Sequence, residues 1–217
     1  MSLLPDELCM FPLGSVLLPG MALPLRVFEP RYRLMMDEVL AADPPRFGVV
    51  LIERGSEVGG GDVRTDVGCV AVVKAVEEQP DGTLALLAVG DQRVRVREWL
   101  PDDPFPRARV EHWPEPDGTA GTDSPDGTAE LDALAEEVLG VTRLALRLLG
   151  EQPPPPLQLA QDPVRRCFEL ATLAPLGALD RQRVLCAEGL SERVALLGEL
   201  VAEQRLLLEA RERFEQG

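Results

Sequence analysis

A stretch dense in proline, glycine and acidic residues, 114–127, divides this chain into two parts. It reads PEPDGTAGTDSPDG, and the surrounding window 111–140 holds nine acidic side chains and no basic one. Such a composition cannot bury an apolar face, and its prolines and glycines interrupt any regular element. We therefore expect a flexible linker at 114–127 between a first domain, 1–113, and a second domain, 128–217.

The first domain is predicted to consist mainly of strands. Short runs rich in β-branched residues indicate strands at 46–52, 67–76, 84–89 and 92–96. The tripeptide 80–82 (Pro-Asp-Gly) is a turn signal because proline presets φ and glycine accepts a positive value, and 90–91 (Gly-Asp) is a second candidate. One helix, 30–41, interrupts the strands, since its apolar residues recur at helical spacing.

The second domain is predicted to be helical. Helices are expected at 128–149, from 163, at 180–187 and from 191. Thr128 is a suitable N-cap for the first of these helices, Gly150 a suitable stop, and Asp162 a suitable cap for the next. Strands first and helices afterwards predict an α+β fold in two segregated parts.

Charge and composition exclude several classes of protein. The formal net charge is −15, and nucleic-acid affinity comes largely from Lys and Arg, so nucleic acid is a disfavoured partner. No stretch approaches the roughly 18 consecutive apolar residues of a membrane span. The first residues lack the basic segment of a signal peptide, so we expect a cytoplasmic, reducing location. With four scattered cysteines and a single histidine, we expect no metal site.

No catalytic constellation emerges from the sequence. The glycine-rich segment 55–62 has the spacing of a phosphate-binding loop, but Gly61 and Asp62 stand where lysine and a hydroxyl residue are needed. His112 is the single histidine, and no serine lies in a G-x-S-x-G, which disfavours a nucleophilic triad. Lys74, the only lysine, alternates with valines as solvated strand residues do. We expect neither enzymatic activity nor a cofactor.

Three arginines, Arg93, Arg95 and Arg97, alternate with valines along one predicted strand. Period 2 places their guanidinium groups on one face. One interpretation is an RNA or anion contact surface. The other, which the net charge favours, is a solvated face opposite acidic residues of a neighbouring strand.

Residues 11–32, FPLGSVLLPGMALPLRVFEPRY, resemble the opening of the Lon protease N-terminal domain. That family begins with FPL, continues through a proline-containing loop to a strand ending in PLxIFE, and places RY on its first helix. Later segments are similar to the family as well, at 66–68, 80–82, 90–94, 180–185 and 192–194. The resemblance runs from about residue 8 to about residue 209.

The resemblance implies a small β pseudo-barrel of the PUA-like type with one inserted helix, followed by a helical bundle. A full Lon protease continues into an ATPase module and a Ser–Lys peptidase, and neither is found up to Gly217. The implied function is that of a stand-alone, non-catalytic substrate-binding domain in protein quality control. Its implied partners are unfolded or hydrophobic polypeptide segments and a separate protease or chaperone, with a contribution to homo-oligomer assembly. The alternative is a PUA-like RNA-binding domain that uses the arginine strand.

Leu17, Leu18 and Met21 are the candidate peptide-binding residues. They lie in or beside the loop 16–20, which is bounded by proline and glycine, and connections of this kind run over the surface. Apolar side chains there, methionine especially, suit adaptable contact with a hydrophobic segment. The alternative is that they fold back and join the core. The following residues of the opening motif are predicted to be packing residues: Phe11, Leu13, Leu25, Val27, Phe28 and Tyr32.

Overall fold

The computed structural model describes residues 5–55, 63–116, 125–152 and 158–216. The chain divides into two compact units, unit 1 up to Pro114 and unit 2 from Glu115. Nearly all of the glycine-rich segment 55–62 and most of the expected linker 114–127 lie outside the described residues.

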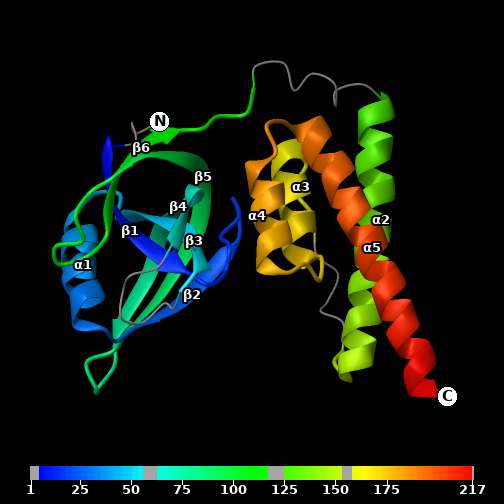
Figure 1. Ribbon diagram of the computed structural model, residues 1–217, viewed down its shortest axis with the longest axis horizontal. Coiled ribbons are helices and arrows are strands. Elements are labelled where there is room, and N and C mark those ends of the chain that lie inside the picture. The colour runs from blue at the N-terminus through cyan, green and yellow to red at the C-terminus, as the bar shows by residue number, and fades with distance from the viewer. Residues whose placement is uncertain (1–4, 56–62, 117–124, 153–157, 217) are drawn as a thin grey trace. The chain divides into compact units, whose positions relative to one another are not determined.

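In the residues that the structure describes, unit 1 is a six-stranded sheet with one helix (Figure 1). Its elements are β1 (Glu7–Leu13), β2 (Ala22–Val27), α1 (Pro30–Ala41), β3 (Arg46–Arg54), β4 (Val63–Glu78), β5 (Leu84–Trp99) and β6 (Arg107–His112). The strand order is β2-β5-β4-β3-β1-β6, with β1 and β3 parallel and the other pairs antiparallel. Since β5 also pairs with β6, five strands close into a ring, and β2 is added beside the first half of β5.

The predicted turn at 90–91 is wrong, because β5 is one continuous strand from Leu84 to Trp99. The β4–β5 pairing shifts its register at this point, between Cys69 and Ala71. Glycine is needed at position 90 for a close approach rather than for a turn. A Cβ atom there would lie 2.2 Å from the carbonyl oxygen of Leu18.

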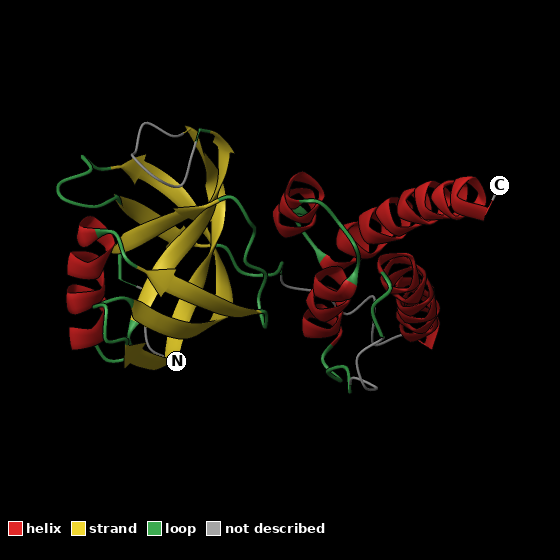
Figure 2. Cartoon of the chain, turned by 90° about the horizontal axis from the view of Figure 1, so that it is seen from below, coloured by secondary structure: helices red, strands yellow, loops and turns green. Residues whose placement is uncertain are grey.

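The central strands bury both of their faces. One core lies between the sheet and α1, which runs along one side of the strands (Figure 2), and Phe11 stacks on Tyr32 there with ring centroids 4.2 Å apart. A second core collects side chains from all five ring strands, such as Met10 and Val94, and therefore fills the ring. The packing prediction is correct for Phe11 and Tyr32 but wrong for Phe28, which is 62% exposed. Phe28 follows the last residue of β2, so the sheet does not cover it.

The described residues of unit 2 form a bundle of four helices. These helices are α2 (Pro125–Leu149), α3 (Pro163–Leu173), α4 (Ala178–Cys186) and α5 (Leu190–Gln216). The predicted cap of α3 is confirmed, since the Asp162 carboxylate accepts a hydrogen bond from the Arg165 amide at 2.8 Å. Gly150, at φ +72°, ends α2 as predicted. The predicted start of α2 is wrong, because the helix begins three residues before Thr128, at a proline that suits a first turn.

Helices α2 and α5 run in the same direction side by side (Figure 1). The Nη2 atom of Arg205 on α5 lies 3.3 Å from the Oε1 atom of Glu137 on α2. Further along both helices, the Nη2 atom of Arg147 lies 2.9 Å from the Oε1 atom of Glu212. Within the described residues, each helix is too short or too polar to cross a membrane.

Unit 2 contains a fully buried arginine, Arg193 of α5. Its Nη2 atom lies 2.8 Å from a carboxylate oxygen of Glu115, and its guanidinium carbon lies 4.1 Å from the centre of the Phe168 ring. Burying a charge is unfavourable unless it is paired. The Glu115 carboxylate therefore holds the first residue of unit 2 against the helices.

We expect the substitution Glu115→Ala to lower the free energy of unfolding by about 3 kcal/mol, because it leaves the Arg193 charge buried without its carboxylate. Urea denaturation followed by helical circular dichroism measures the change. The control is Glu215→Ala, which removes an exposed ion pair with Arg211 and is expected to cost less than about 0.5 kcal/mol. Equal costs for the two variants would contradict the role assigned to Glu115.

Candidate functional site

The predicted peptide-binding loop is mostly buried. Leu17 is 2% exposed and Leu18 is 0% exposed, and Met21 is half-buried against the core beneath α1. The loop packs over Gly90, whose missing side chain admits the Leu18 carbonyl group. The expectation that Leu17 and Leu18 offer an exposed contact is therefore corrected, and the alternative, that they join the core, describes the structure.

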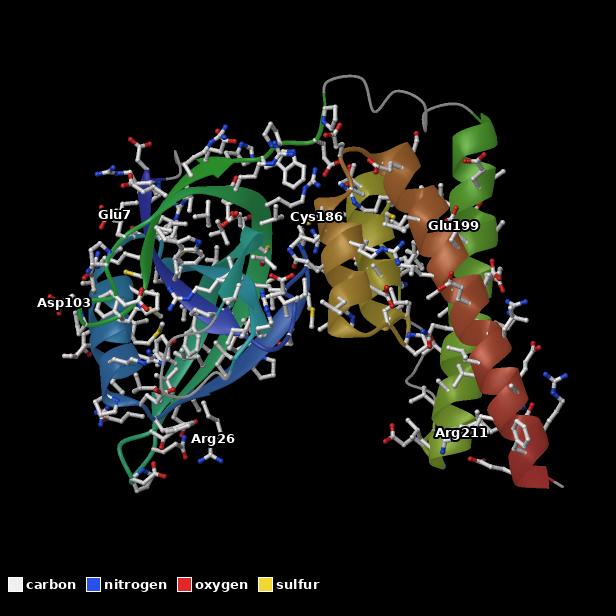
Figure 3. All side chains as sticks on the ribbon, in the orientation of Figure 1. Glu7, Arg26, Asp103, Cys186, Glu199 and Arg211 are labelled. Carbon is white, nitrogen blue, oxygen red and sulfur yellow. The ribbon has the colours of Figure 1, made fainter. Side chains whose placement is uncertain are left out.

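An exposed apolar surface lies instead on the outer face of β2, β5 and β4. In register, three cross-strand rows follow one another: Ala22, Val89 and Val72; Pro24, Leu87 and Ala75; Arg26, Ala85 and Glu77. We call these nine residues the outer sheet surface. Its first two rows carry no charge, and Leu87 at their centre is 42% exposed. Arg26, labelled in Figure 3, belongs to the third row. The exposed Lys74 is the unpaired residue of β4 at the register shift between the first two rows, so one positive charge borders them.

The same three strands are apolar on their inner face, where Leu23, Leu86 and Val73 belong to the core beneath α1. Antiparallel sheets commonly bury one face and present polar residues on the other. The segment 84–89 departs from that pattern, because LALLAV contains no polar residue on either face. This continuous apolar run was the sequence signal for the surface, although by itself it predicted only a strand. Contiguous exposed apolar surface marks sites of interaction.

The free edge of β2 is partly closed to further strands. The Gly90 amide donates to the Met21 carbonyl group at 2.9 Å, so the alternate residues Ala22, Pro24 and Arg26 turn their main-chain groups away from β5. Pro24 has no N–H group to offer there, which is how proline is used on edge strands. The side chains of the face, rather than the main chain of the edge, are thus the accessible contact.

The arginine strand is engaged within unit 1. Arg93 is 3% exposed, and the guanidinium carbons of Arg93 and Arg95 lie 4.4 and 3.6 Å from the centre of the Trp113 ring. Arg97 forms an ion pair with Glu111 of the neighbouring strand β6. For Arg97 the interpretation of a charge opposite an acidic neighbour is correct, whereas the burial of Arg93 was not anticipated.

Within the described ranges of the chain, the catalytic candidates that the sequence offered do not come together. His112 and Lys74 are exposed. The Cys9 thiol donates to a Glu38 carboxylate oxygen at 3.5 Å beside a cavity of about 320 Å³, but burial raises the pKa of Cys9 to about 12. Hydrogen bonds from Arg107 hold the pKa of Glu38 below its usual value, so Glu38 is a weak base. Among the described residues, no cluster of three potential ligands could hold a metal ion.

Comparison with known proteins identifies related domains. The family model described as the ATP-dependent protease La (LON) substrate-binding domain matches residues 7–203. The chain is 26% identical to a Lon protease of Heliobacterium modesticaldum over 94% of its own length, and 27% identical to Lon protease 2 of Thermus thermophilus over 99%. It spans about a quarter of the length of these curated relatives, 25% and 26%.

The solved structures that are similar to the chain include two Lon N-terminal domains. A Lon N-terminal domain protein from Xanthomonas campestris has a TM-score of 0.60 and 26% identity, covering 88% of this chain and 96% of that one. The N-terminal domain of a Mycobacterium avium complex Lon protease has the same TM-score at 16% identity, covering 90% of this chain and 98% of that one, and thus shows a shared fold.

We expect one of the four thiols to react rapidly in the folded protein. Burial raises the pKa values of Cys9 and Cys167 to about 12 and raises that of Cys69 further, whereas Cys186 is half-buried. Titration with a thiol reagent at pH 8, with mass spectrometry of the labelled peptides, should find Cys186 modified first and the other three only after unfolding. Rapid labelling of Cys9 would show that its thiolate is available for chemistry.

Proposed function

The chain belongs to the family of Lon protease substrate-binding domains, and on that premise we propose that it binds unfolded polypeptide through the outer sheet surface without catalysing a reaction. The observation that carries the proposal is the pair of uncharged rows centred on Leu87, which an otherwise strongly acidic chain leaves exposed. Unfolded polypeptides expose apolar side chains that folded ones bury. An exposed apolar surface therefore binds unfolded polypeptides in preference to folded ones, because contact removes apolar area from water.

The form of the surface favours weak, unselective contact. Alanine, proline and valine side chains make it shallow, and the core directly beneath it holds the strands in place. A shallow apolar face has few deep pockets for anchoring side chains, and such pockets supply most of the affinity of tight interfaces. We expect dissociation constants between about 1 µM and 1 mM.

We further propose that bound polypeptide is delivered to a separate protease, so that the module acts as an adaptor in protein quality control. The relatives that support this are named Lon proteases, and the chain spans about a quarter of their length. A reducing, cytoplasmic location is part of the proposal, because all four cysteines are free and three of them are buried.

RNA binding by the arginine strand is the weaker candidate. Arg97 is paired with Glu111, and Arg93 is buried, so the strand offers few guanidinium groups to phosphates. Ionic strength separates the two functions, because phosphate contacts lose affinity steeply with salt whereas apolar contacts change little.

The variant Leu87→Ser is expected to weaken binding of a permanently unfolded protein, reduced and carboxymethylated α-lactalbumin, by about tenfold, because it removes the central apolar side chain of the surface. Fluorescence anisotropy of the labelled, unfolded protein measures the affinity. The matched control is Val76→Ser: Val76 is 44% exposed on the neighbouring strand, but it is paired with Leu86, on the inner side of the sheet.

We expect Val76→Ser to bind within about twofold of the wild-type protein. Equal losses in the two variants would show that the outer sheet surface is not the contact. Absence of saturable binding by the wild-type protein up to millimolar concentration would overturn the proposed function itself.

A further inference from the structure

A trough runs between the first halves of α2 and α5 in unit 2. Its volume is about 400 Å³, and its lining includes Glu130, Ala133 and Glu137 from α2 and Ala195, Gly198 and Glu199 from α5. On each helix these residues recur at spacings of three and four, so each helix contributes one continuous stripe. The lined part of α5, 191–199, spans about 12 Å along the helix axis, or roughly two turns.

The floor of the trough is apolar and is formed by residues with small side chains or none. Ala133 and Ala195 face the opening with small side chains, and a Cβ atom added at Gly198 would meet nothing within 4 Å. Small residues allow another helix to approach to the short end of the usual 8–10 Å interaxial range. The shape of the trough therefore suits a third helix packed against α2 and α5 better than it suits a small molecule.

The rims of the trough are acidic. Glu130 and Glu137 lie along the α2 side, and Glu199, labelled in Figure 3, lies on the α5 side. Glu137 is paired with Arg205 at 3.3 Å. Within the part of the chain that the structure describes, neither Glu130 nor Glu199 has an ion-pair partner. Carboxylates on both rims of an apolar floor complement a helix that carries basic side chains on both flanks of an apolar stripe.

We propose that this trough binds an amphipathic helix of a partner polypeptide, with small or apolar residues on one face and Lys or Arg along its flanks. The net charge of −15 disfavours a second copy of the same chain as the occupant, because like charges repel. The trough lies in unit 2 and shares no residue with the outer sheet surface, so a test of one proposal does not decide the other.

The test uses the full chain and an 18-residue helical peptide with alanine and leucine on one face and lysine on both flanks. Isothermal titration calorimetry should show saturable binding, and a peptide with the same apolar face but glutamate flanks should bind at least about tenfold more weakly. Gly198→Trp fills the trough, and we expect it to weaken binding about tenfold or more. Gly198→Ala adds one carbon into open space and serves as the control for folding and helix stability.

Charge-matched variants separate specific from general attraction. Glu199→Lys and Glu209→Lys change the net charge equally, but Glu209 is exposed on α5 beyond the trough. We expect about a tenfold loss for Glu199→Lys and less than twofold for Glu209→Lys. Equal losses of affinity in the two variants would show that the attraction is non-specific and would overturn the proposal. Wild-type affinity in Gly198→Trp, or no binding of the lysine-flanked peptide, would overturn it as well. Sedimentation that shows self-association blocked by Gly198→Trp would identify a second copy as the occupant instead.

Discussion

Unit 1 depends on the pairing of one long strand with three others. The first half of β5 lies between β2 and β4, and its second half pairs with β6 and closes the ring. Between these two halves β5 requires glycine at position 90, because the Leu18 carbonyl group lies where a side chain would be. The ring, its core and the outer sheet surface all follow from this single strand, so the fold and the candidate site share one structural cause.

Local signals in the sequence predicted local structure well. The Pro-Asp-Gly turn at 80–82 and the cap at Asp162 each follow from a few neighbouring residues, and the structure agrees with them. The α+β class, predicted from strands first and helices afterwards, is confirmed as well. The continuity of β5 did not follow, because Gly90 and Asp91 carry the composition of a turn. Only the distant loop that packs on Gly90 distinguishes a close approach from a turn, and no local pattern contains that information.

The candidate site was predicted less completely for the same reason. Leu17 and Leu87 are both leucines among apolar neighbours, yet one is 2% exposed and the other 42% exposed. What separates them is their cover: Leu17 lies in the loop that packs over Gly90, whereas Leu87 lies on a strand face that no described element covers, and both are properties of the whole unit. Arg193 is a second example, since its partner Glu115 lies 78 residues earlier in the chain. Burial of a charged side chain can be recognised only when its distant partner is known.

Pro24 has a consequence for how such a module would treat its clients. An unfolded chain carries strand-forming segments with unpaired main-chain groups, and an open sheet edge would capture them through a growing ladder of hydrogen bonds. A proline facing outward on β2 interrupts that ladder at its middle. Under the proposed function, clients would then be retained mainly by side-chain contact, and the interrupted edge would disfavour growth of a sheet on the module.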